Sequence, residues 1–474
     1  MHVLYDAGNI AAAVNDNRRL RGARVPRVAL VIAAIVLGAF ASFMMRQRAA
    51  PSRPPAGVSA SGYDTAATPV SSNDAATEAA IRFYTARVQR DAEDTRSQNA
   101  LAELYLQRVR ETGNEDYLPL ALNAARASLA AVEAERNIGG LTGLAHAEFA
   151  NHDFAAARDH AMQLTPLQPD RGEPYAILAD ARIELGDYGG ANEALQRLQE
   201  LDANNAGTET RLARFAVLHG DADAAQQHLH KALALLQSLQ QPPAETIAWC
   251  HWQLGEVTFS MGDAKNAESH YRDALAIVPD YFRALLSLGR LSAARGDLQV
   301  AIEYYERAVR IIPAVDSMAA LGDLYHLAGR ERDAAARYEL VEQLGEHSRV
   351  VHGSPYNRNI ALFYADHGVK PEEAYALARG EYDAGRHDIY GADALAWTAL
   401  KSGRIAEAQA AIKEALKLGT LDARLLYHAG MIAHAAGDQA AAIKYLQRAL
   451  ALNPGFDPLQ TKVVRETLRS LNVQ

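Results

Sequence analysis

The chain has 474 residues, of which 49% are hydrophobic and 7% are aromatic. This length is too great for one hydrophobic core, which points to an array of units that each bury a face on their neighbours. The formal net charge of −9 argues against nucleic acid as a partner, because a phosphate-binding face needs clustered Lys and Arg. The single cysteine, Cys250, excludes an internal disulfide.

The amino-terminal part contains one long apolar run, Val28 to Met45, with 18 residues and no charge. As a helix it would be about 27 Å long, close to the apolar thickness of a bilayer. Residues 28–45 are therefore predicted to form a transmembrane signal anchor. Signal-peptide cleavage after Ala39-Phe40-Ala41 and a buried soluble helix are the two alternatives.

Arginines flank this run unequally, with five on its amino side and three before the first downstream acid, Asp64. The positive-inside rule then predicts a cytoplasmic basic N-terminus, residues 1–27. The remainder of the chain is predicted to be periplasmic or extracytoplasmic.

A segment rich in Ala, Ser, Pro, Gly and Thr follows the apolar run, and residues 46–80 are predicted to be a flexible linker. A helix is expected to resume near Asp74, with Ile81, Tyr84 and Val88 among its apolar positions. Residues 81–97 are assigned to this lead-in helix.

An internal repeat is clearest after Trp249. Leu254-Gly255, Gly262, Ala267, Tyr271, Ala274 and Pro279 recur 34 residues later as Leu288-Gly289, Gly296, Ala301, Tyr305, Ala308 and Pro313. Small residues allow two helices to approach closely, and the tyrosines are expected to fill the space that they leave. The second glycine of each set suits a left-handed turn, and the proline can end the second helix.

The turn residue of this pattern marks the repeats along the chain. It falls at His152, Gly186, Gly220, Gly262, Gly296, Gly329, Gly368, Gly403 and Gly437. Extra residues between Leu235 and Glu245 lengthen one repeat, and a second longer step contains a loop-like stretch, Glu346 to Tyr356. With a degenerate first unit, the pattern predicts about ten repeats over residues 98–456 and a C-terminal capping helix within residues 457–474.

These residue types and this spacing resemble the tetratricopeptide repeat (TPR) family, whose unit of about 34 residues is a helix, a tight turn and a second helix. The resemblance implies an all-α, right-handed α-solenoid, here preceded by the predicted transmembrane helix. It also implies that the first helices of the repeats line a concave groove that binds extended peptides or partner helices.

Motifs that carry chemistry are scarce in this sequence. It contains no P-loop, no HExxH, no paired CxxC and no GxSxG. We therefore predict no enzymatic activity, no catalytic residues, no cofactor and no metal site. His228 and His230 point about 200° apart on a helix, and His428 and His434 are also badly placed to share a metal.

Candidate partner-binding residues follow from the resemblance, because one face of each first helix usually lines the groove in this family. That face gives Trp249, Trp252, Glu256, Arg283, Arg290, Asp323, His326, Arg358, Tyr390, Asp393, Trp397, Arg424, Tyr427, Met431 and His434. Rigid aromatic residues flanked by arginine are typical of binding hot spots. The alternative is that the tryptophans pack between adjacent helices and that Glu256, Arg290 and Asp323 pair between neighbouring repeats.

These features predict a non-catalytic, membrane-anchored scaffold that assembles proteins of a bacterial envelope through its groove. Its partner is expected to be a protein or peptide, with no nucleic acid involved. The alternative is a chaperone-like maturation factor that holds an unfolded or cofactor-bearing client protein. A third interpretation is an obligate subunit that supports catalysis within a multi-enzyme complex.

Overall fold

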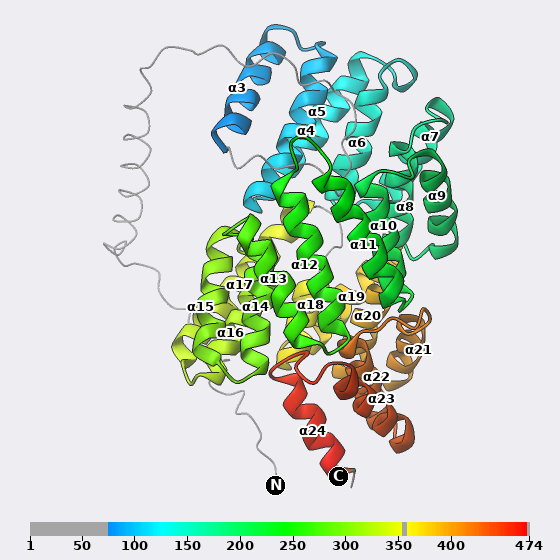
Figure 1. Cartoon of the computed structure of the whole chain (residues 1–474). Coiled ribbons are helices and arrows are strands. Elements are labelled where there is room, and N and C mark those ends of the chain that lie inside the picture. The colour runs from blue at the N-terminus through cyan, green and yellow to red at the C-terminus, as the bar shows by residue number, and fades with distance from the viewer. Residues whose placement is uncertain (1–73, 353–357, 472–474) are drawn as a thin grey trace, which may run out of the picture. The chain divides into compact units, whose positions relative to one another are not determined.

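The computed structural model describes residues 74–352 and 358–471, which belong to one compact unit (Figure 1). Within these ranges the chain is helical and has no β-strand, which confirms the all-α prediction for them. The predicted cytoplasmic segment 1–27 and the predicted anchor 28–45 lie outside the described residues. Among the helices that are described, none combines the length and the apolar character needed to cross a bilayer.

The described helices form ten consecutive pairs, α4/α5 to α22/α23, and the two helices of each pair pack on each other. These ten pairs agree with the predicted number of repeats. Helix α3 precedes the pairs and α24 follows them. The bounds are α3 Asp74–Arg90, α4 Thr95–Thr112, α5 Tyr117–Ala131, η2 Ala134–Arg136, α6 Ile138–Ala150, α7 Phe154–Leu167, α8 Glu173–Glu184, α9 Tyr188–Leu201, α10 Ala206–Leu218, α11 Ala222–Gln237, α12 Ala244–Ser260, α13 Ala264–Ile277, α14 Phe282–Ala294, α15 Leu298–Ile311, α16 Val315–Leu327, α17 Glu331–His352, α18 Arg358–His367, α19 Pro371–Asp383, α20 Ile389–Lys401, α21 Ile405–Ala415, α22 Ala423–Ala435, α23 Gln439–Leu452 and α24 Gln460–Ser470.

The start of the array differs from the predicted boundaries. Helix α3 begins at Asp74, which confirms the helix expected to resume near this residue, so the predicted linker, residues 46–80, ends too late. This first turn is rich in alanine, which favours a helix, and Thr77 donates a hydrogen bond to Glu111 of α4 at 3.0 Å. The predicted lead-in helix, residues 81–97, in fact ends at Arg90, and a new helix starts after the N-cap residue Asp94.

Every predicted turn residue leaves its first helix in the left-handed conformation. The φ angle is 61° at His152 and ranges from 64° at Gly368 to 87° at Gly296 for the predicted glycines. Gly113, with φ of 67°, makes the same turn in the degenerate first repeat, although the sequence pattern did not identify it. Glycine adopts this conformation without the Cβ clash that strains other residues.

The predicted packing role of the small residues is also confirmed. A Cβ added at Gly289 would lie 2.5 Å from the ring of Tyr305, and a Cβ added at Gly255 would overlap the ring of Tyr271. Ala301 on the second helix is fully buried. The close approach of glycine and tyrosine therefore sets the spacing of the two helices in these repeats.

The two longer repeats have different structures. Helix α11 extends to Gln237 before a loop leads into α12, as the extra residues predicted. The predicted loop at Glu346 to Tyr356 is wrong for its first part, because α17 continues as a helix to His352. Arg349 pairs with Glu346 at 2.6 Å, and Val351 packs against the core of the first repeat, so both contacts favour the helix. Residues 353–357 lie outside the described residues.

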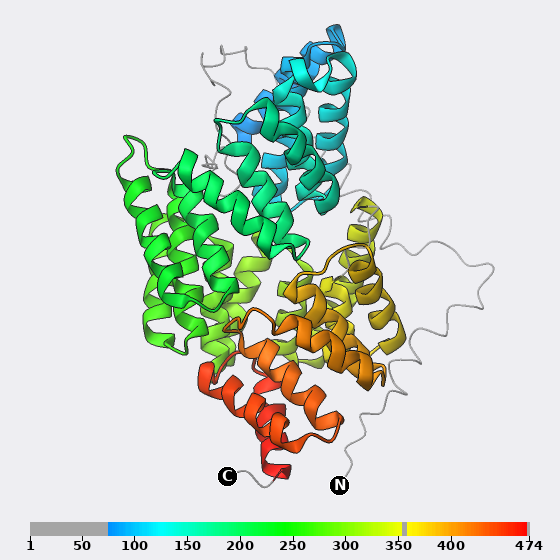
Figure 2. The same cartoon turned by 90° about the vertical axis from the view of Figure 1, so that its right-hand side faces the viewer.

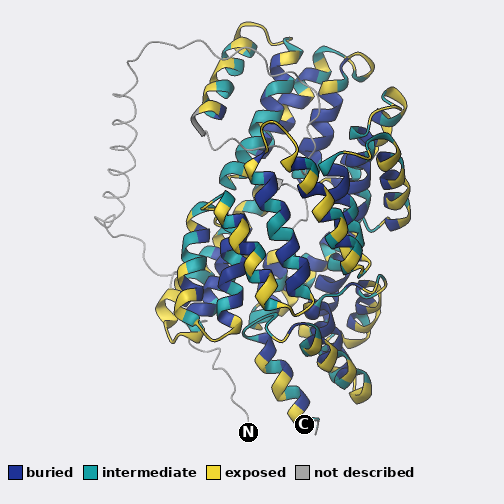
Figure 3. Cartoon of the chain, in the orientation of Figure 1, coloured by how far each residue is buried: buried dark blue, intermediate teal, exposed yellow. Residues whose placement is uncertain are grey.

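The last helix, α24, covers the end of the array as the capping prediction required. Val464 is fully buried, and it packs in one cluster with Leu446 of α23. Figure 3 shows the buried residues along the faces where neighbouring helices meet. A terminal repeat would otherwise expose this apolar face to water.

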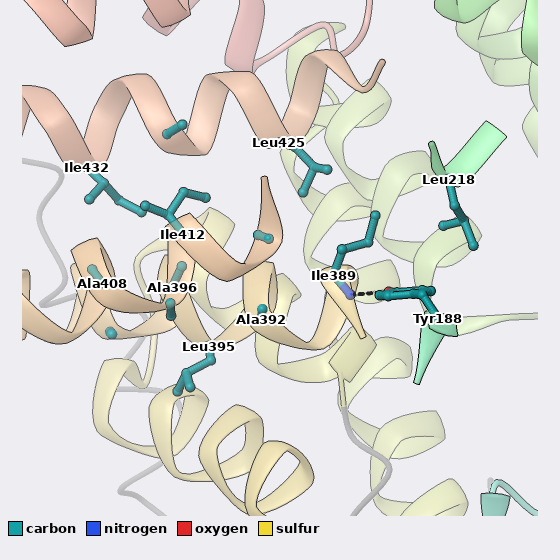
Figure 4. Packing of buried hydrophobic residues seen from close by; sticks show 14 of the residues in the cluster. Tyr188, Leu218, Ile389, Ala392, Leu395, Ala396, Ala408, Ile412, Leu425 and Ile432 are labelled. Carbon is teal, nitrogen blue, oxygen red and sulfur yellow. Dashed lines mark hydrogen bonds between the residues drawn. The ribbon is translucent and has the colours of Figure 1, made fainter. Parts of the chain in front are cut away.

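Repeats about 200 residues apart also contact each other. The N–H of Ile389 donates to the Tyr188 hydroxyl at 2.9 Å across 201 residues, and Leu218 belongs to the same apolar cluster (Figure 4). Asn453 donates to the carbonyl of Phe259 at 3.0 Å across 194 residues. Figure 2 shows the corresponding green and orange helices side by side.

We call this contact the turn interface. It joins the turns 185–187, 219–221 and 261–263 to the loops 384–388, 416–422 and 453–459. A Cβ at Gly220 would lie 2.6 Å from the Gly419 carbonyl oxygen, and a Cβ at Gly262 would lie 2.7 Å from the Leu452 oxygen. These glycines therefore form the turns, and because they lack a Cβ they also allow a backbone segment from about 200 residues away to pack against them.

Candidate functional site

The predicted groove residues of the ninth and tenth repeats are largely enclosed. Trp397 and Tyr427 are each 1% exposed, and their ring centroids lie 5.3 Å apart. Trp397 also stacks on His428 at 4.2 Å and donates its indole N–H to Asp366 at 2.8 Å. Asp393 is buried as well and contacts Nδ1 of His428 at 2.8 Å. This placement favours packing as the role of Trp397, Tyr427 and Asp393.

The predicted charged residues of the fifth and sixth repeats pair with each other. Arg290 contacts both carboxylate oxygens of Glu256, at 2.7 and 2.8 Å, which confirms the pairing of these two. Burial alone would raise the pKa of Glu256, but Arg290 and the neighbouring donors outweigh it and lower that pKa. Ser287 donates to Glu256 and accepts from the Trp252 indole, and Arg283 lies 5.1 Å from the Trp252 ring.

Most of the remaining predicted residues contact other side chains of the array. The contacts are Asp323 with His367 at 2.7 Å, His326 with Glu331 at 3.0 Å, Arg424 with Asp366 at 3.5 Å and Met431 with Thr467 at 3.8 Å. His434 is half-buried. Asp323 therefore pairs with a histidine of the eighth repeat.

Three predicted residues meet at one cavity. Trp249 of α12, Arg358 of α18 and Tyr390 of α20 line a space of about 300 Å³. Trp249 and Tyr390 are both half-buried residues. The cavity lies where the third to fifth repeats meet the eighth and ninth, and we call it the inner cavity. It depends on the turn interface, because that interface brings these repeats together.

The charged residues at the inner cavity form a connected network. Arg386 donates to Glu184 at 2.8 Å, and Arg358 donates to Asp388 at 2.8 Å. Arg214 also pairs with Glu184. Burial alone would raise the pKa of Asp388, but Arg358 and Arg386 outweigh it and hold the pKa below its usual value. The carboxylates of Glu184 and Asp388 both pair with arginines, so they are poorly suited to hold a metal ion.

The rest of the wall gives the inner cavity a mixed character. Ile183, Leu218 and Val257 contribute apolar surface, while the side chain of Arg214 is 40% exposed. Five charged side chains, Glu184, Arg214, Arg358, Arg386 and Asp388, line the same space. Apolar surface and charged groups therefore lie side by side in the inner cavity.

Sequence reasoning missed Glu184, Arg386 and Asp388. Glu184 is the last residue of α8, and the other two lie in the loop before α20, so none belongs to the predicted face of a first helix. A local signal was present, since Asp388 accepts hydrogen bonds from the N–H groups of Tyr390 and Gly391 as a helix N-cap. That signal marks a helix start, however, and says nothing about a contact with α8.

Parts of the repeat array are similar to known protein families and structures. Two family models described as tetratricopeptide repeat match this chain, one at residues 205–280 and the other at residues 253–316 and 394–455. A solved structure of a TPR protein from Thermus thermophilus is 19% identical, covers 45% of this chain and 99% of its own, and has a TM-score of 0.34.

Two curated relatives match shorter stretches. A probable biofilm formation methyltransferase of Pseudomonas putida is 36% identical over 107 residues, which cover 23% of this chain and 24% of that protein. A putative cellulose synthase operon protein C of Escherichia coli is 28% identical over 123 residues, which cover 26% of this chain and 10% of that protein. The chain thus spans a quarter or less of the length of these relatives.

Proposed function

Because this chain belongs to the tetratricopeptide repeat family, we propose that it is a non-catalytic scaffold that binds a protein partner at the inner cavity. TPR proteins generally bind other proteins rather than catalyse reactions. The observation that carries the proposal is the pair of half-buried rings, Trp249 and Tyr390, beside the arginine network. Binding hot spots concentrate in such aromatic and arginine residues.

The volume of the inner cavity limits how large a part of the partner can enter it. A space of about 300 Å³ suits one or two side chains of a partner segment and is too small for a whole helix. Trp397 and Tyr427 are enclosed within the array, so they are less suited to contact a partner than Trp249 and Tyr390. The proposed site is therefore narrower than the long groove that the sequence predicted.

The proposal is tested by affinity purification of the full chain from solubilised membranes. Trp249→Ala and Tyr390→Ala are each expected to weaken partner binding by about 2 kcal/mol or more, seen as lost partner bands. Trp252→Ala is the matched control, because this tryptophan lies on the same helix but hydrogen-bonds Ser287 at 3.0 Å. Equal loss in all three variants, or no loss in the first two, would contradict the proposed site.

The purification also separates a scaffold from a chaperone-like factor. A scaffold is expected to return folded partners in fixed ratio to the bait. A mixed, substoichiometric set of clients would instead support a chaperone-like maturation factor that holds unfolded proteins.

We further propose that residues 28–45 anchor the chain in a membrane, with the array outside the cytoplasm among other envelope proteins. The support is the uncharged apolar run and the excess of arginines on its amino side. A reporter that is active only outside the cytoplasm is expected to work when fused after Asp64. Activity of a cytoplasm-only reporter at the same position would reverse the proposed orientation.

A further inference from the structure

Two histidines and one aspartate meet on the fifth repeat. His251 belongs to α12, and His270 and Asp273 belong to α13, the second helix of the same repeat. One ligand atom of each side chain lies within 4.8 Å of the other two. Nδ1 of His251 is 3.8 Å from Oδ2 of Asp273, and the two imidazole centroids are 6.4 Å apart.

The fold of the repeat holds these three side chains together. His270 and Asp273 are three residues apart on one helix, so they lie on the same face. Gly255 of α12 admits the ring of Tyr271, which brings α13 close to α12 at this level. The contact that sets the spacing of the repeat therefore also sets the distance from His251 to the other two residues.

The nitrogens of this cluster are available to a ligand. Nδ1 of His251 and Nδ1 of His270 are both buried, and neither makes a hydrogen bond with any residue that the structure describes. Nδ1 of His228 on the neighbouring helix α11, by contrast, contacts Glu209 at 2.7 Å.

We propose that His251, His270 and Asp273 bind one Zn²⁺ ion. Ligand atoms of a tetrahedral zinc site lie about 3.4 Å apart, so small side-chain rotations close the present 3.8 Å separation between His251 and Asp273. Two imidazoles and one carboxylate suit Zn²⁺, whereas Mg²⁺ and Ca²⁺ prefer sites built of oxygen ligands.

Three protein ligands leave one tetrahedral position open for a water molecule. The ion would join α12 to α13, because His251 comes from the first helix and the other two ligands come from the second.

Zinc binding is measured on the full chain in detergent, purified without a polyhistidine tag, by competition with a chromogenic chelator. One Zn²⁺ per chain is expected. His251→Ala and His270→Ala should weaken the affinity by about 100-fold or more, since loss of even an indirect partner of a ligand costs about 10- to 100-fold. His326→Ala is the control, because that imidazole pairs with Glu331 outside the cluster, and it should leave the affinity unchanged. Absence of saturable binding, or equal affinity in His270→Ala and the unchanged chain, would overturn the proposal.

Two further measurements separate lost ligands from lost folding. Asp273→Asn changes an exposed side chain with little change in shape, so the chain should fold while zinc no longer raises its thermal midpoint. Co²⁺ in the unchanged protein should give the intense visible bands of a tetrahedral site. Weak octahedral bands, or an equal zinc-induced shift of the midpoint in Asp273→Asn, would refute the site.

Discussion

The turns of the early repeats and those of the late repeats share a backbone conformation but differ in their surroundings. Gly220 and Gly403 have φ of 71° and 80°, and each donates its N–H at 3.0 Å to the carbonyl three residues earlier. A Cβ at Gly220 would lie 2.6 Å from the Gly419 oxygen, whereas a Cβ at Gly403 would meet no described atom within 4 Å. Gly403 in a late repeat therefore only forms the turn. Gly220 in an early repeat forms the turn and also leaves room for the distant loop that contains Gly419.

This difference shows what a repeat sequence encodes and what it leaves open. Each unit specifies its own turn and its contacts with the next unit, as expected for a solenoid. The turn interface adds contacts across about 200 residues, such as the hydrogen bond between Ile389 and Tyr188 across 201 residues. The inner cavity exists between the two sets of repeats that this interface joins.

The largest expected loss of stability is that caused by Gly220→Ala. A Cβ in the left-handed region costs about 1 kcal/mol, and the clash with the backbone of Gly419 adds about 2 kcal/mol, for a loss of about 3 kcal/mol. Gly403→Ala should cost about 1 kcal/mol, since the conformational term acts alone there. Denaturant unfolding of both variants measures the difference. Equal losses would remove the distinction between early and late turns.

The ionic contact across the turn interface gives the next largest effect. Arg386 is 8% exposed and bonds Glu184 at 2.8 Å, so Arg386→Met should destabilise by about 2 kcal/mol. Arg404→Met is the matched control, because its partner Glu372 is 70% exposed, and it should change stability by less than about 1 kcal/mol. If thermal melts of the two variants coincide, the buried pair does not stabilise the interface.

A smaller effect is expected at Thr420, whose hydroxyl donates to the carbonyl of Leu218. Thr420→Val keeps the shape and removes this hydrogen bond, which should cost about 1 kcal/mol. Thr165→Val, which removes a hydrogen bond within an exposed helix turn, should cost less. A calorimetric comparison in which Thr165→Val is the more destabilising change would argue against the contact at Leu218.

The smallest expected effect is a change in how the free energy of unfolding depends on pH, and it comes from Asp388. The folded-state pKa of Asp388 is held below its ordinary value by Arg358 and Arg386, against the opposing effect of burial. Its contribution to stability is therefore present above the ordinary carboxyl pKa and is lost as the pH falls through the folded-state pKa. Asp388→Asn should flatten the acid limb of the stability curve below about pH 4. An unchanged acid limb in this variant would contradict the assigned charge state.

The local structure was predictable because each signal acts within one repeat or between adjacent repeats. The turn glycines, the fit of Gly289 against Tyr305 and the pair Glu256–Arg290 all follow from residues at most one unit apart. The helix expected near Asp74 does begin there, and only the assigned end of the linker, at residue 80, was wrong.

The parts that could not be predicted depend on contacts between elements. Glu184 and Arg386 meet across 202 residues, and no periodicity specifies which turn of the array covers which loop. The proximity of His251 and His270 could not be predicted, because these two residues belong to different helices and are 19 positions apart in the sequence. Trp397 fits the pattern of a groove residue and is nevertheless enclosed by His428 and Tyr427.

Amide hydrogen exchange on the full chain tests most directly whether the late repeats cover the early turns and so form the inner cavity. Turns 219–221 and 402–404 make the same local hydrogen bonds, with Gly220 and Gly403 each donating at 3.0 Å. Slower exchange at 219–221 than at 402–404 is expected, since the first turn is covered by the loop that contains Gly419. Equally fast exchange at both turns would contradict the turn interface and the cavity that depends on it.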